Sequence, residues 1–387
     1  MSVSKSRIKA RVWLKENLFS SWKNTFLTCL SAAVLLFITK GILSWLIFTA
    51  NWEVIYANIR LLMVGQYPVE EIWRIWTMLC LAMFLLGMSW GIYRGVFTQI
   101  SVVLIVIFAV TALIPFISGT ARLWLFLEII LIGAGYWFGR TFSHVKKFYL
   151  ICWVVCFPLI LLLINGFGLL KHVKSNLWGG FYLTILIAIV TIVFSFPLGI
   201  LLALGRRSKL PAIHWFCVVY IEAVRGVPLI TVLFMSQLLL PLFIGNLFEL
   251  SSVLRVMIGF TLFNAAYVAE TVRGGMQAIP RGQYEAAEAL GLNYVQRMTF
   301  IIMPQALRNV IPALVGTIIE VFKDTSLVAI VSLMDLMGIA KRIIANPQFL
   351  GRQMEVFIFV ASVFLVLCLL LSNVSKRLEI TLNRDRN

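Results

Sequence analysis

Three ionisable residues lie close together inside one apolar stretch of the sequence. Glu320, Lys323 and Asp324 are spaced at i, i+3 and i+4, so a helix would carry them on one face. A lysine can pair with the carboxylate of an amino acid, and a neighbouring protein carboxylate can pair with its ammonium group. We therefore predict that this helix face contacts a zwitterionic ligand.

The hydroxyl residues Thr325 and Ser326 follow directly and complete the segment KDTS. Both side chains can donate and accept hydrogen bonds, so we include them in the predicted ligand path. Two alternatives remain open at this point. The charges could form a salt bridge between helices with the hydroxyls only packing, or a second subunit could hold the ligand.

Two further pairs of opposite charges have the i, i+3 spacing of neighbours on a helix. Glu222 and Arg225 precede Pro228, and we predict an intrahelical pair at an elbow where the proline kinks or restarts the helix. A structural or gating role suits this pair better than ligand contact. Glu270 and Arg273 end another apolar stretch, and we expect them to tie that helix to its surroundings.

A water-compatible loop at 285–304, EAAEALGLNYVQRMTFIIMP, interrupts the apolar runs. Its first part consists of strong helix formers, and Gly291 provides a stop for that helix. A second short helical piece follows, and Pro304 is placed to open the next helix at its first turn. We predict a helix–turn–helix elbow with a hinge at each end. Its alanines give a helix surface without large side chains, which could fit into a groove of another protein. The alternative is that the loop is only a solvent-exposed connector.

The residue types that catalysis or metal binding needs are scattered along the chain. His144, His172 and His214 lie far apart, and the six cysteines show no C-x-x-C spacing. We therefore predict no catalytic residue, no metal site and no disulfide framework. The G-x-x-x-x-G-K-[ST] pattern of the P-loop is absent from the sequence. The chain therefore does not bind ATP phosphates through a P-loop.

The elements that carry these residues follow from composition. The 387 residues are 61% hydrophobic and 13% charged, and the apolar runs are continuous, which predicts an all-α polytopic membrane protein rather than a β-barrel. The first apolar run is too long for a cleavable signal. We predict about ten spans, near 26–50, 72–92, 98–118, 121–139, 148–170, 178–204, 213–244, 252–272, 306–334 and 354–374.

The formal net charge of +17 is distributed unevenly. With these spans, most of the 33 lysines and arginines fall on one side of the membrane, in 1–24, 93–97, 140–147, 205–211, 273–308 and 375–387. The positive-inside rule therefore predicts that both termini are cytosolic. The charge indicates contact with anionic lipid, not with nucleic acid.

The sequence suggests three parts. Residues 1–24 form a basic leader that we predict to be an amphipathic helix on the inner leaflet, with a disordered tail as the alternative. Residues 25–171 form a five-span N-terminal module, in which we expect Lys40 and Glu128 to pair. Residues 172–387 form a working module that includes the loop and the charged face.

The loop resembles the EAA loop of the permease subunits of binding-protein-dependent ABC importers. The resemblance rests on Glu285-Ala286-Ala287, Gly291, Ile301 and Met303-Pro304, with methionine where leucine is usual. It implies a five-helix type I importer core in 172–387 and a loop that docks into a cleft of a separate ATPase subunit. It also implies that the KDTS segment lines a central cavity.

The flanking segments YIEAVRGVPLITVLFM (220–235) and FKDTSLVAIVSLMDL (322–336) are similar to the polar amino acid branch of this family. The leader and the ten-span length resemble the M-type permease of general L-amino-acid importers. Implied partners are ATPase subunits that bind and hydrolyse ATP, a second homologous permease subunit and a periplasmic amino-acid-binding protein. The implied location is the inner membrane of a bacterium.

Two functions of other classes fit the sequence less well. An ion-coupled secondary amino acid transporter would explain charges inside the membrane, but it predicts repeats and broken helices in matching positions of the two halves, and neither is evident. A membrane-embedded enzyme would need a cluster of catalytic groups. The sequence therefore favours an ATP-driven amino acid importer subunit without a cofactor of its own.

Overall fold

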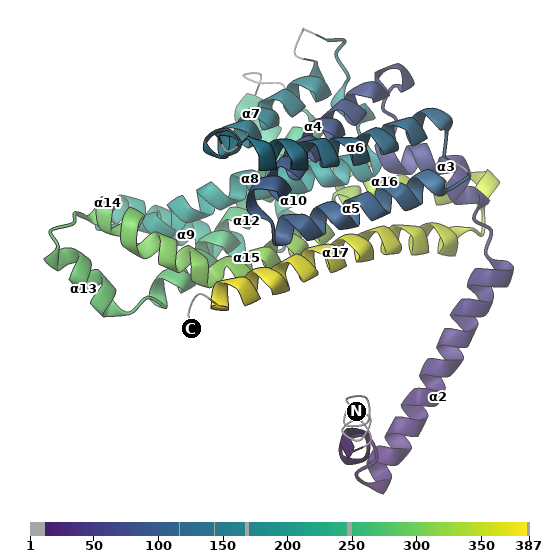
Figure 1. Ribbon diagram of the computed structural model, residues 1–387, viewed down its shortest axis with the longest axis horizontal. Coiled ribbons are helices and arrows are strands. Elements are labelled where there is room, and N and C mark those ends of the chain that lie inside the picture. Colours follow the sequence, from purple (N-terminus) through teal and green to yellow (C-terminus); the bar gives the residue numbers. More distant parts are fainter. Residues whose placement is uncertain (1–11, 116, 143, 167–169, 246–249, 385–387) are drawn as a thin grey trace. The chain divides into compact units, whose positions relative to one another are not determined.

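The computed structural model describes residues 12–115, 117–142, 144–166, 170–245 and 250–384, and these consist of helices joined by short connections (Figure 1). Within them, β-structure is limited to two isolated bridges, Gly65 with Trp178 and Gly180 with Asp335. The predicted all-α fold is confirmed. By its packing the chain separates into two units, residues 1–54 and 55–387, which are treated separately below.

The first unit consists mainly of α2 (Trp22–Ser44), which continues through a π-helical turn, η1 (Trp45–Thr49). Ser21 caps α2 by accepting a hydrogen bond from the backbone N–H of Asn24. No residue of α2 is buried, and its surface is apolar all round, as expected of a helix that faces lipid. Residues 12–17 of the predicted leader are helical, and residues 1–11 lie outside the described residues.

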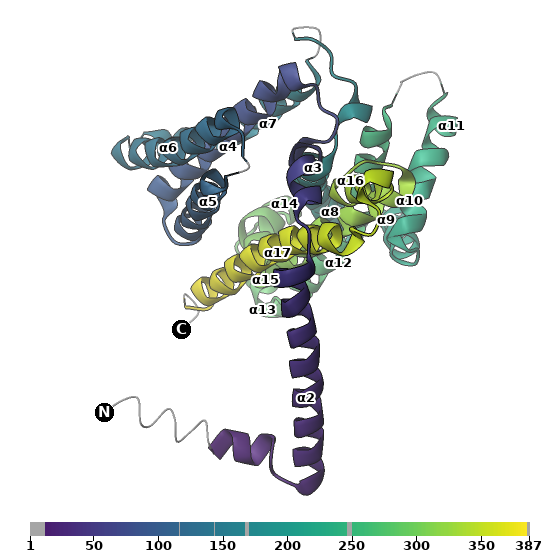
Figure 2. The ribbon, with the colours of Figure 1, turned by 90° about the vertical axis from the view of Figure 1, so that its right-hand side faces the viewer.

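The N-terminal half of the second unit is a group of helices that Figure 2 shows to one side of the C-terminal half. It includes α4 (Ile72–Tyr93), α5 (Val96–Leu113), α6 (Gly119–Thr141) and α7 (Val145–Asn165), preceded by a short η2 (Val69–Glu71). Helix α3 (Glu53–Val64) precedes this group in sequence and was not predicted; its end lies against the start of α8, since a Cβ atom on Gly180 would lie 2.3 Å from the carbonyl oxygen of Leu62.

Helices α4 and α6 pack against each other through glycines. A Cβ atom on Gly135 of α6 would lie 2.2 Å from the carbonyl oxygen of Phe84, and one on Gly87 of α4 would lie 2.2 Å from that of Ile132. Without side chains at these points the two backbones touch, which is how small residues drive helix association in membranes. Glu128 of α6 is fully buried and accepts a hydrogen bond from Cys80 at 3.2 Å. Lys40 belongs to the first unit, so its pairing with Glu128 stays a prediction.

The C-terminal half centres on two long helices, α8 (Gly180–Gly205) and α12 (Ser252–Gln277). Between them in sequence lie the connector helices α9 (Pro211–Arg225), α10 (Leu229–Leu238) and α11 (Leu240–Ile244). Helix α15 (Met303–Asp324) packs on α12, and α17 (Gln353–Arg384) packs on α15. The remaining short elements are η3 (Ser175–Leu177), η6 (Thr325–Val331), α16 (Leu336–Ile344) and η7 (Pro347–Phe349).

The halves of the second unit share one hydrophobic core. Met78 of α4 and Ile164 of α7 are buried in the same cluster as Leu183 of α8 and Phe260 of α12. The module boundary predicted after residue 171 is therefore not a gap in the packing. It coincides with the segment that leads into α8.

Eight helices of the described residues are long and apolar enough to cross a membrane, and the pair α9 and α10 would be a ninth span with a bend of 108°. The bend lies within the span predicted at 213–244, at the elbow predicted before Pro228, because Gly226 and Pro228 interrupt the helix. The span predicted at 306–334 is not among the eight. Its helix α15 ends at Asp324, and the chain continues in the 3-10 turns of η6.

Candidate functional site

The water-compatible loop folds into a helical elbow at one end of the second unit, with α3 and α16 at the other end (Figure 1). Helix α13 (Arg281–Ala289) follows α12 after a turn at Pro280. It ends in a Schellman motif, in which Gly291 N–H bonds to the carbonyl of Glu288 and Leu292 N–H to that of Ala287. Gly291 has φ +74°, a left-handed conformation that favours glycine. The predicted helix stop at this residue is therefore present.

Pro304 lies in the first turn of α15, as predicted, but this second predicted hinge is not a break in the chain of helical residues. Asn293 caps the next helical segment in a capping box with Gln296. From there α14 (Tyr294–Gln296), the π-helical η5 (Arg297–Ile302) and α15 follow without interruption. A π-turn just before a proline accommodates its missing N–H. The rigid segment that leads to Asp324 thus begins near residue 294, ten residues earlier than predicted.

Exposure divides the residues predicted in the loop. Glu285, Ala286, Gly291 and Pro304 are exposed, whereas Ile301 is half-buried. Ala287 is buried, so the second alanine of the motif belongs to the interior of the elbow. The outer surface is instead formed by the glutamate and the first alanine of this motif.

Three apolar side chains on the elbow are more than two-thirds exposed and were not predicted. Leu290, Val295 and Phe300 have exposed fractions of 77%, 68% and 69%. Leu290 and Val295 stand outside the apolar runs of the sequence, and Phe300 begins the short run 300–303. Exposed apolar side chains gathered in one place mark surfaces that contact other proteins. We call these three residues the elbow patch.

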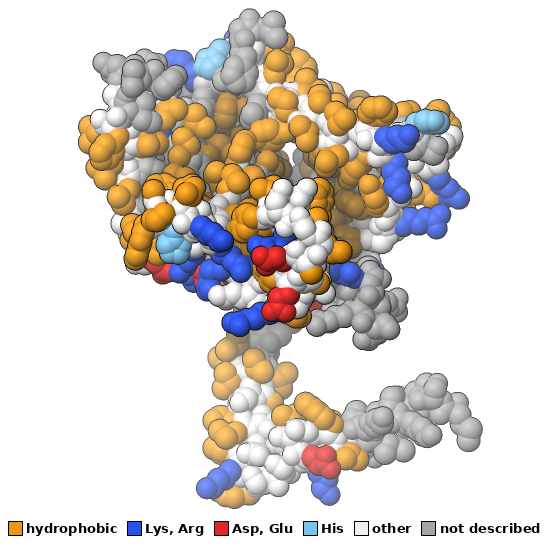
Figure 3. Space-filling view, turned by 90° about the vertical axis from the view of Figure 1, so that its left-hand side faces the viewer, with side chains coloured by type: hydrophobic (Ala, Val, Ile, Leu, Met, Phe, Trp, Pro, Cys, Tyr) orange, Lys and Arg blue, Asp and Glu red, His pale blue; other side chains and the backbone are white. Residues whose placement is uncertain are grey.

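Hydrogen bonds join the elbow to the helices beneath it. The Tyr284 hydroxyl donates to the carbonyl of Met276 at 3.0 Å and accepts from Arg207, which follows α8. Arg297 of η5 forms an ion pair with Glu288 of α13 at 3.1 Å. Figure 3 views this end of the second unit and shows basic side chains gathered around a few acidic ones. Helix α13 is therefore held against α12, against η5 and against the residues that follow α8.

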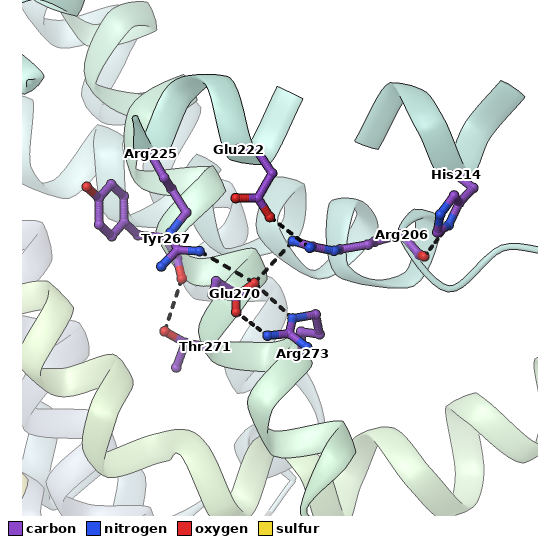
Figure 4. Close-up of polar contacts among 8 residues, drawn as sticks. All are labelled: Arg206, His214, Glu222, Arg225, Tyr267, Glu270, Thr271 and Arg273. Atoms are coloured by element: carbon purple, nitrogen blue, oxygen red, sulfur yellow. Dashed lines mark hydrogen bonds and ion pairs between the residues drawn. The ribbon is translucent and has the colours of Figure 1, made fainter. Parts of the chain in front are cut away.

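An ion-pair cluster lies beneath the elbow, where α8, α9 and α12 meet (Figure 4). Glu270 is at its centre and contacts three arginines: Arg273 by a bond from Nε at 2.9 Å, Arg206 at 3.3 Å and Arg225 at 3.7 Å. The contact of Glu270 with Arg273 matches the predicted spacing. Arg206, the residue after α8, was not predicted as a partner of either carboxylate.

The predicted pair of Glu222 with Arg225 is wrong in its partners. Glu222 instead contacts Arg206 at 2.8 Å, and Arg225 reaches Glu270 and lies over the ring of Tyr267. Because α9 ends at Arg225, the two side chains extend toward different neighbours. The cluster therefore ties three helices together, and Pro228 begins α10 directly beyond it.

The charged face predicted on α15 is accessible. Glu320 and Lys323 are exposed and Asp324 is half-buried, and no ion pair among the described residues involves Lys323 or Asp324. Lys323 and Ser326 line a cavity of about 370 Å³ with Met337, Phe357 and Phe364. A lysine in a cavity with apolar walls can hold a carboxylate and exclude water from it.

The two hydroxyl residues lie in different surroundings. Thr325 is fully buried, and its hydroxyl donates to the carbonyl of Phe322 at 2.6 Å, so it does not line the cavity. Ser326 lines the cavity with Lys323, and its hydroxyl donates to the carbonyl of Lys323 at 2.8 Å. No cluster of three or more metal-ligating side chains occurs in the part of the chain that the structure describes.

Comparison with known proteins agrees with the geometry. Residues 195–382 match the family model described as "Binding-protein-dependent transport system inner membrane component". The chain is 36% identical to the inner membrane amino-acid ABC transporter permease protein YhdY of Escherichia coli (strain K12), covering 98% of this chain and 94% of that protein.

Two further relatives bear on the organisation of the chain. The glutamate/glutamine/aspartate/asparagine transport system permease protein BztC of Rhodobacter capsulatus is 36% identical over 98% of this chain and 95% of its own length. The glutamate/aspartate import permease protein GltK of Escherichia coli O157:H7 is also 36% identical, but over 49% of this chain and 86% of its own length. About half of this chain thus corresponds to nearly a whole shorter permease.

Proposed function

Because this chain belongs to the family of amino-acid ABC transporter permeases, we propose that its 285–304 elbow couples the membrane helices to a separate ATPase subunit. The chain is a multi-pass inner membrane protein and a permease subunit of an ATP-driven amino acid importer. Its relatives are transport proteins and not enzymes. The observation that carries the proposal is that Val295 and Phe300 of the elbow patch are exposed on a segment that continues as one helical run into α15.

The proposed coupling is mechanical. A groove of the ATPase receives α13, with Glu285 and Ala286 on its rim and the elbow patch in its apolar part. ATP is bound and hydrolysed by that partner, and this chain contributes no cofactor. Closure of the ATPase pair displaces the elbow, and the helical run from Tyr294 to Asp324 carries the displacement to the charged face of α15.

The ion-pair cluster provides the proposed gating contact. Glu270 holds arginines from α8, α9 and α12, so a movement of α12 with the elbow changes the distances to Arg206 and Arg225. Ion pairs that are this exposed each contribute little to the free energy of folding, so the side chains can exchange partners with little change in free energy. The bend between α9 and α10 directly beyond Arg225 is then free to follow α12.

The proposed substrate path runs along α15. Lys323 would bind the carboxylate of an amino acid, and Glu320 or Asp324 its ammonium, with Ser326 beside them. Thr325 would act by holding the helix end. The substrate would pass between this subunit and a second homologous permease subunit, after delivery by a periplasmic amino-acid-binding protein.

Orientation follows from the same proposal. The elbow must face the cytosol to meet an ATPase, and both termini would then be cytosolic, in agreement with the distribution of lysine and arginine. The basic leader would lie on anionic lipid of the inner leaflet. The N-terminal helices that the shorter relatives lack would pack at the edge of the core.

Uptake in reconstituted vesicles tests the proposal. Vesicles that contain the complete importer should accumulate a labelled amino acid only when both ATP and the binding protein are present. Vesicles with a non-hydrolysable ATP analogue serve as the control. Uptake driven by a proton or sodium gradient without ATP would contradict the proposal and support an ion-coupled transporter.

A further inference from the structure

Three helices of the N-terminal half meet at ends that carry basic residues. Helices α4 and α6 end at this place, and α7 begins there. A Cβ atom on Gly91 of α4 would lie 2.9 Å from the backbone nitrogen of Arg140, and the ring centres of Tyr93 and Tyr149 lie 5.2 Å apart. The three helix ends are therefore in contact. We call their four cations the basic end: Arg94, Arg140, Lys146 and Lys147.

The basic end has no negative partner on its own helices. All four cations are exposed, and none of them forms an ion pair among the described residues. Between residues 72 and 221 the sequence contains a single carboxylate, Glu128. It is fully buried, accepts a hydrogen bond from Cys80 and lies about 18 Å along α6 from Arg140. Four like charges thus gather where three helices end, and a bound anion would reduce their mutual repulsion.

Aromatic side chains orient two of these cations. Lys146 Nζ lies 5.9 Å from the ring centre of Tyr93, and Arg140 Nη1 donates to the Tyr136 hydroxyl at 2.9 Å. Arg94 has φ +32°, a backbone conformation that favours glycine. A non-glycine residue keeps such a conformation only where its surroundings impose it, and such residues are frequent at ligand sites. The cations are therefore positioned before a ligand arrives, which lowers the entropy lost on binding.

An exposed apolar surface begins directly next to the basic end. On α7 the two lysines are followed by three side chains that are 70%, 54% and 64% exposed, Leu150, Ile151 and Val154. On α6, Trp137 precedes Arg140 by less than one turn and is 62% exposed. Because both helices are long and apolar enough to cross a membrane, these side chains contact acyl chains. The basic end therefore lies at the level of the lipid head groups.

We propose that the basic end binds the phosphate group of an anionic phospholipid, whose acyl chains lie along α6 and α7. A ligand with a charged head and long apolar chains matches both surfaces, whereas a soluble anion matches only the cations. Basic surfaces between membrane helices bind lipid head groups in this manner. The lipid would join three helix ends of the N-terminal half, to which the proposed function assigns no ligand. This binding does not depend on coupling to an ATPase.

Native mass spectrometry of the purified full-length chain in detergent tests the proposal, because it resolves the protein with and without bound lipid. Phosphatidylglycerol should bind about tenfold more tightly than phosphatidylcholine with the same acyl chains. Arg140→Gln combined with Lys146→Gln should weaken phosphatidylglycerol binding about fivefold for each charge removed, and leave phosphatidylcholine binding unchanged. Lys376→Gln is the matched control, because it removes an exposed lysine of α17 on the same predicted side of the membrane. It should bind both lipids as the wild type does.

Arg94→Gly is a second variant, which removes a charge and releases the backbone from its unfavourable conformation. It should weaken phosphatidylglycerol binding about fivefold, while the unfolding temperature of the chain without added lipid does not fall. Loss of lipid binding in this variant could therefore not be attributed to a failure to fold. Equal affinities for the two lipids, or unchanged phosphatidylglycerol binding in both the double variant and Arg94→Gly, would overturn the proposal.

Two other sources of negative charge are distinguished with the same proteins. Glycerol 3-phosphate carries the phosphate without the acyl chains, and at a concentration equal to that of the lipid it should not displace phosphatidylglycerol. Displacement would mean that the basic end binds a soluble anion. If the double variant retains phosphatidylglycerol binding but no longer co-purifies with the ATPase, then the basic end contacts that protein instead. Either outcome would overturn the proposal.

Discussion

Arg207 holds Tyr284 from two directions. Its Nη1 donates to the tyrosine hydroxyl at 2.9 Å, and its guanidinium carbon lies 5.3 Å from the centre of the tyrosine ring. The arginine follows α8 and the tyrosine belongs to α13, so 77 residues of sequence separate them. This contact joins the elbow to the end of a central helix of the core.

Tyr284→Phe should weaken that connection and leave the ring in place. The change removes the two hydrogen bonds of the hydroxyl, each of which contributes about 1 kcal/mol. We expect ATP hydrolysis by the complete importer to continue while the amount of substrate imported per ATP falls. Tyr294→Phe, at a more exposed tyrosine of the same elbow, is the control and should leave the ratio unchanged.

Gly291→Ala should disturb the shape of the elbow without creating a clash. A Cβ atom there would meet nothing within 4 Å, but φ of +74° costs an alanine about 1 kcal/mol or more. We expect weaker co-purification of the ATPase and reduced uptake, with normal membrane insertion. Gly282→Ala also adds a methyl group in open space, without a positive φ, and should behave as wild type. Equal effects of the two variants would argue against a role for the turn.

Glu270→Gln should destabilise the ion-pair cluster more than Glu222→Gln. Glu270 contacts three arginines and its side chain is 23% exposed, whereas Glu222 contacts one arginine and is 56% exposed. Removing the central carboxylate leaves three cations close together, and we expect a loss of about 1–3 kcal/mol. Thermal unfolding in detergent measures the difference. Equal unfolding temperatures would mean that the arginines find other partners.

Lys323→Gln should raise the KM for the transported amino acid about tenfold, because a neutral amide replaces a charge-assisted bond to the carboxylate. Thr325→Val is the matched change at a hydroxyl that is buried and bonded within its own helix. It should leave the KM unchanged and lower stability slightly. An unchanged KM in Lys323→Gln would assign the substrate site to the second permease subunit.

Gly135→Ala should destabilise the contact between α4 and α6. The added methyl group would lie 2.2 Å from the carbonyl oxygen of Phe84, so the two helices must separate, at a cost of about 1–3 kcal/mol. Gly133→Ala is on the same helix and meets nothing within 4 Å, so it should be tolerated. Expression level and thermal unfolding of the two variants measure the effect.

Local signals predicted the chain's class and the ends of its helices well. Composition and continuous apolar runs correctly indicated an all-α membrane protein. The C-terminal stop at Gly291 was predictable because the left-handed conformation of a helix end is a property of a single residue. Pro304 lies in the first turn of α15, as predicted, but the π-turn before it joins this helix to the preceding segment without a break.

Partners across helices were not predictable. The i, i+3 spacing suggested that Glu222 pairs with Arg225, yet both side chains reach other helices, and Arg206 enters the cluster from the end of α8. The i, i+3 spacing only indicates that two residues lie on the same face of a helix. Which charge lies closest depends on how α8, α9 and α12 are placed, and no short stretch of sequence contains that information.

The sequence by itself determined that this protein inserts into a membrane, where its water-compatible loop lies along the chain, and which residues carry charge in the apolar runs. These properties follow from the transfer energy of individual side chains and from the conformational preferences of a few residues. Only the tertiary structure decided that Glu270 contacts three arginines, that Thr325 is buried while Ser326 lines a cavity, and that Arg206 joins the ion-pair cluster from the end of α8. The physical reason is that long-range contacts depend on the packing of whole helices.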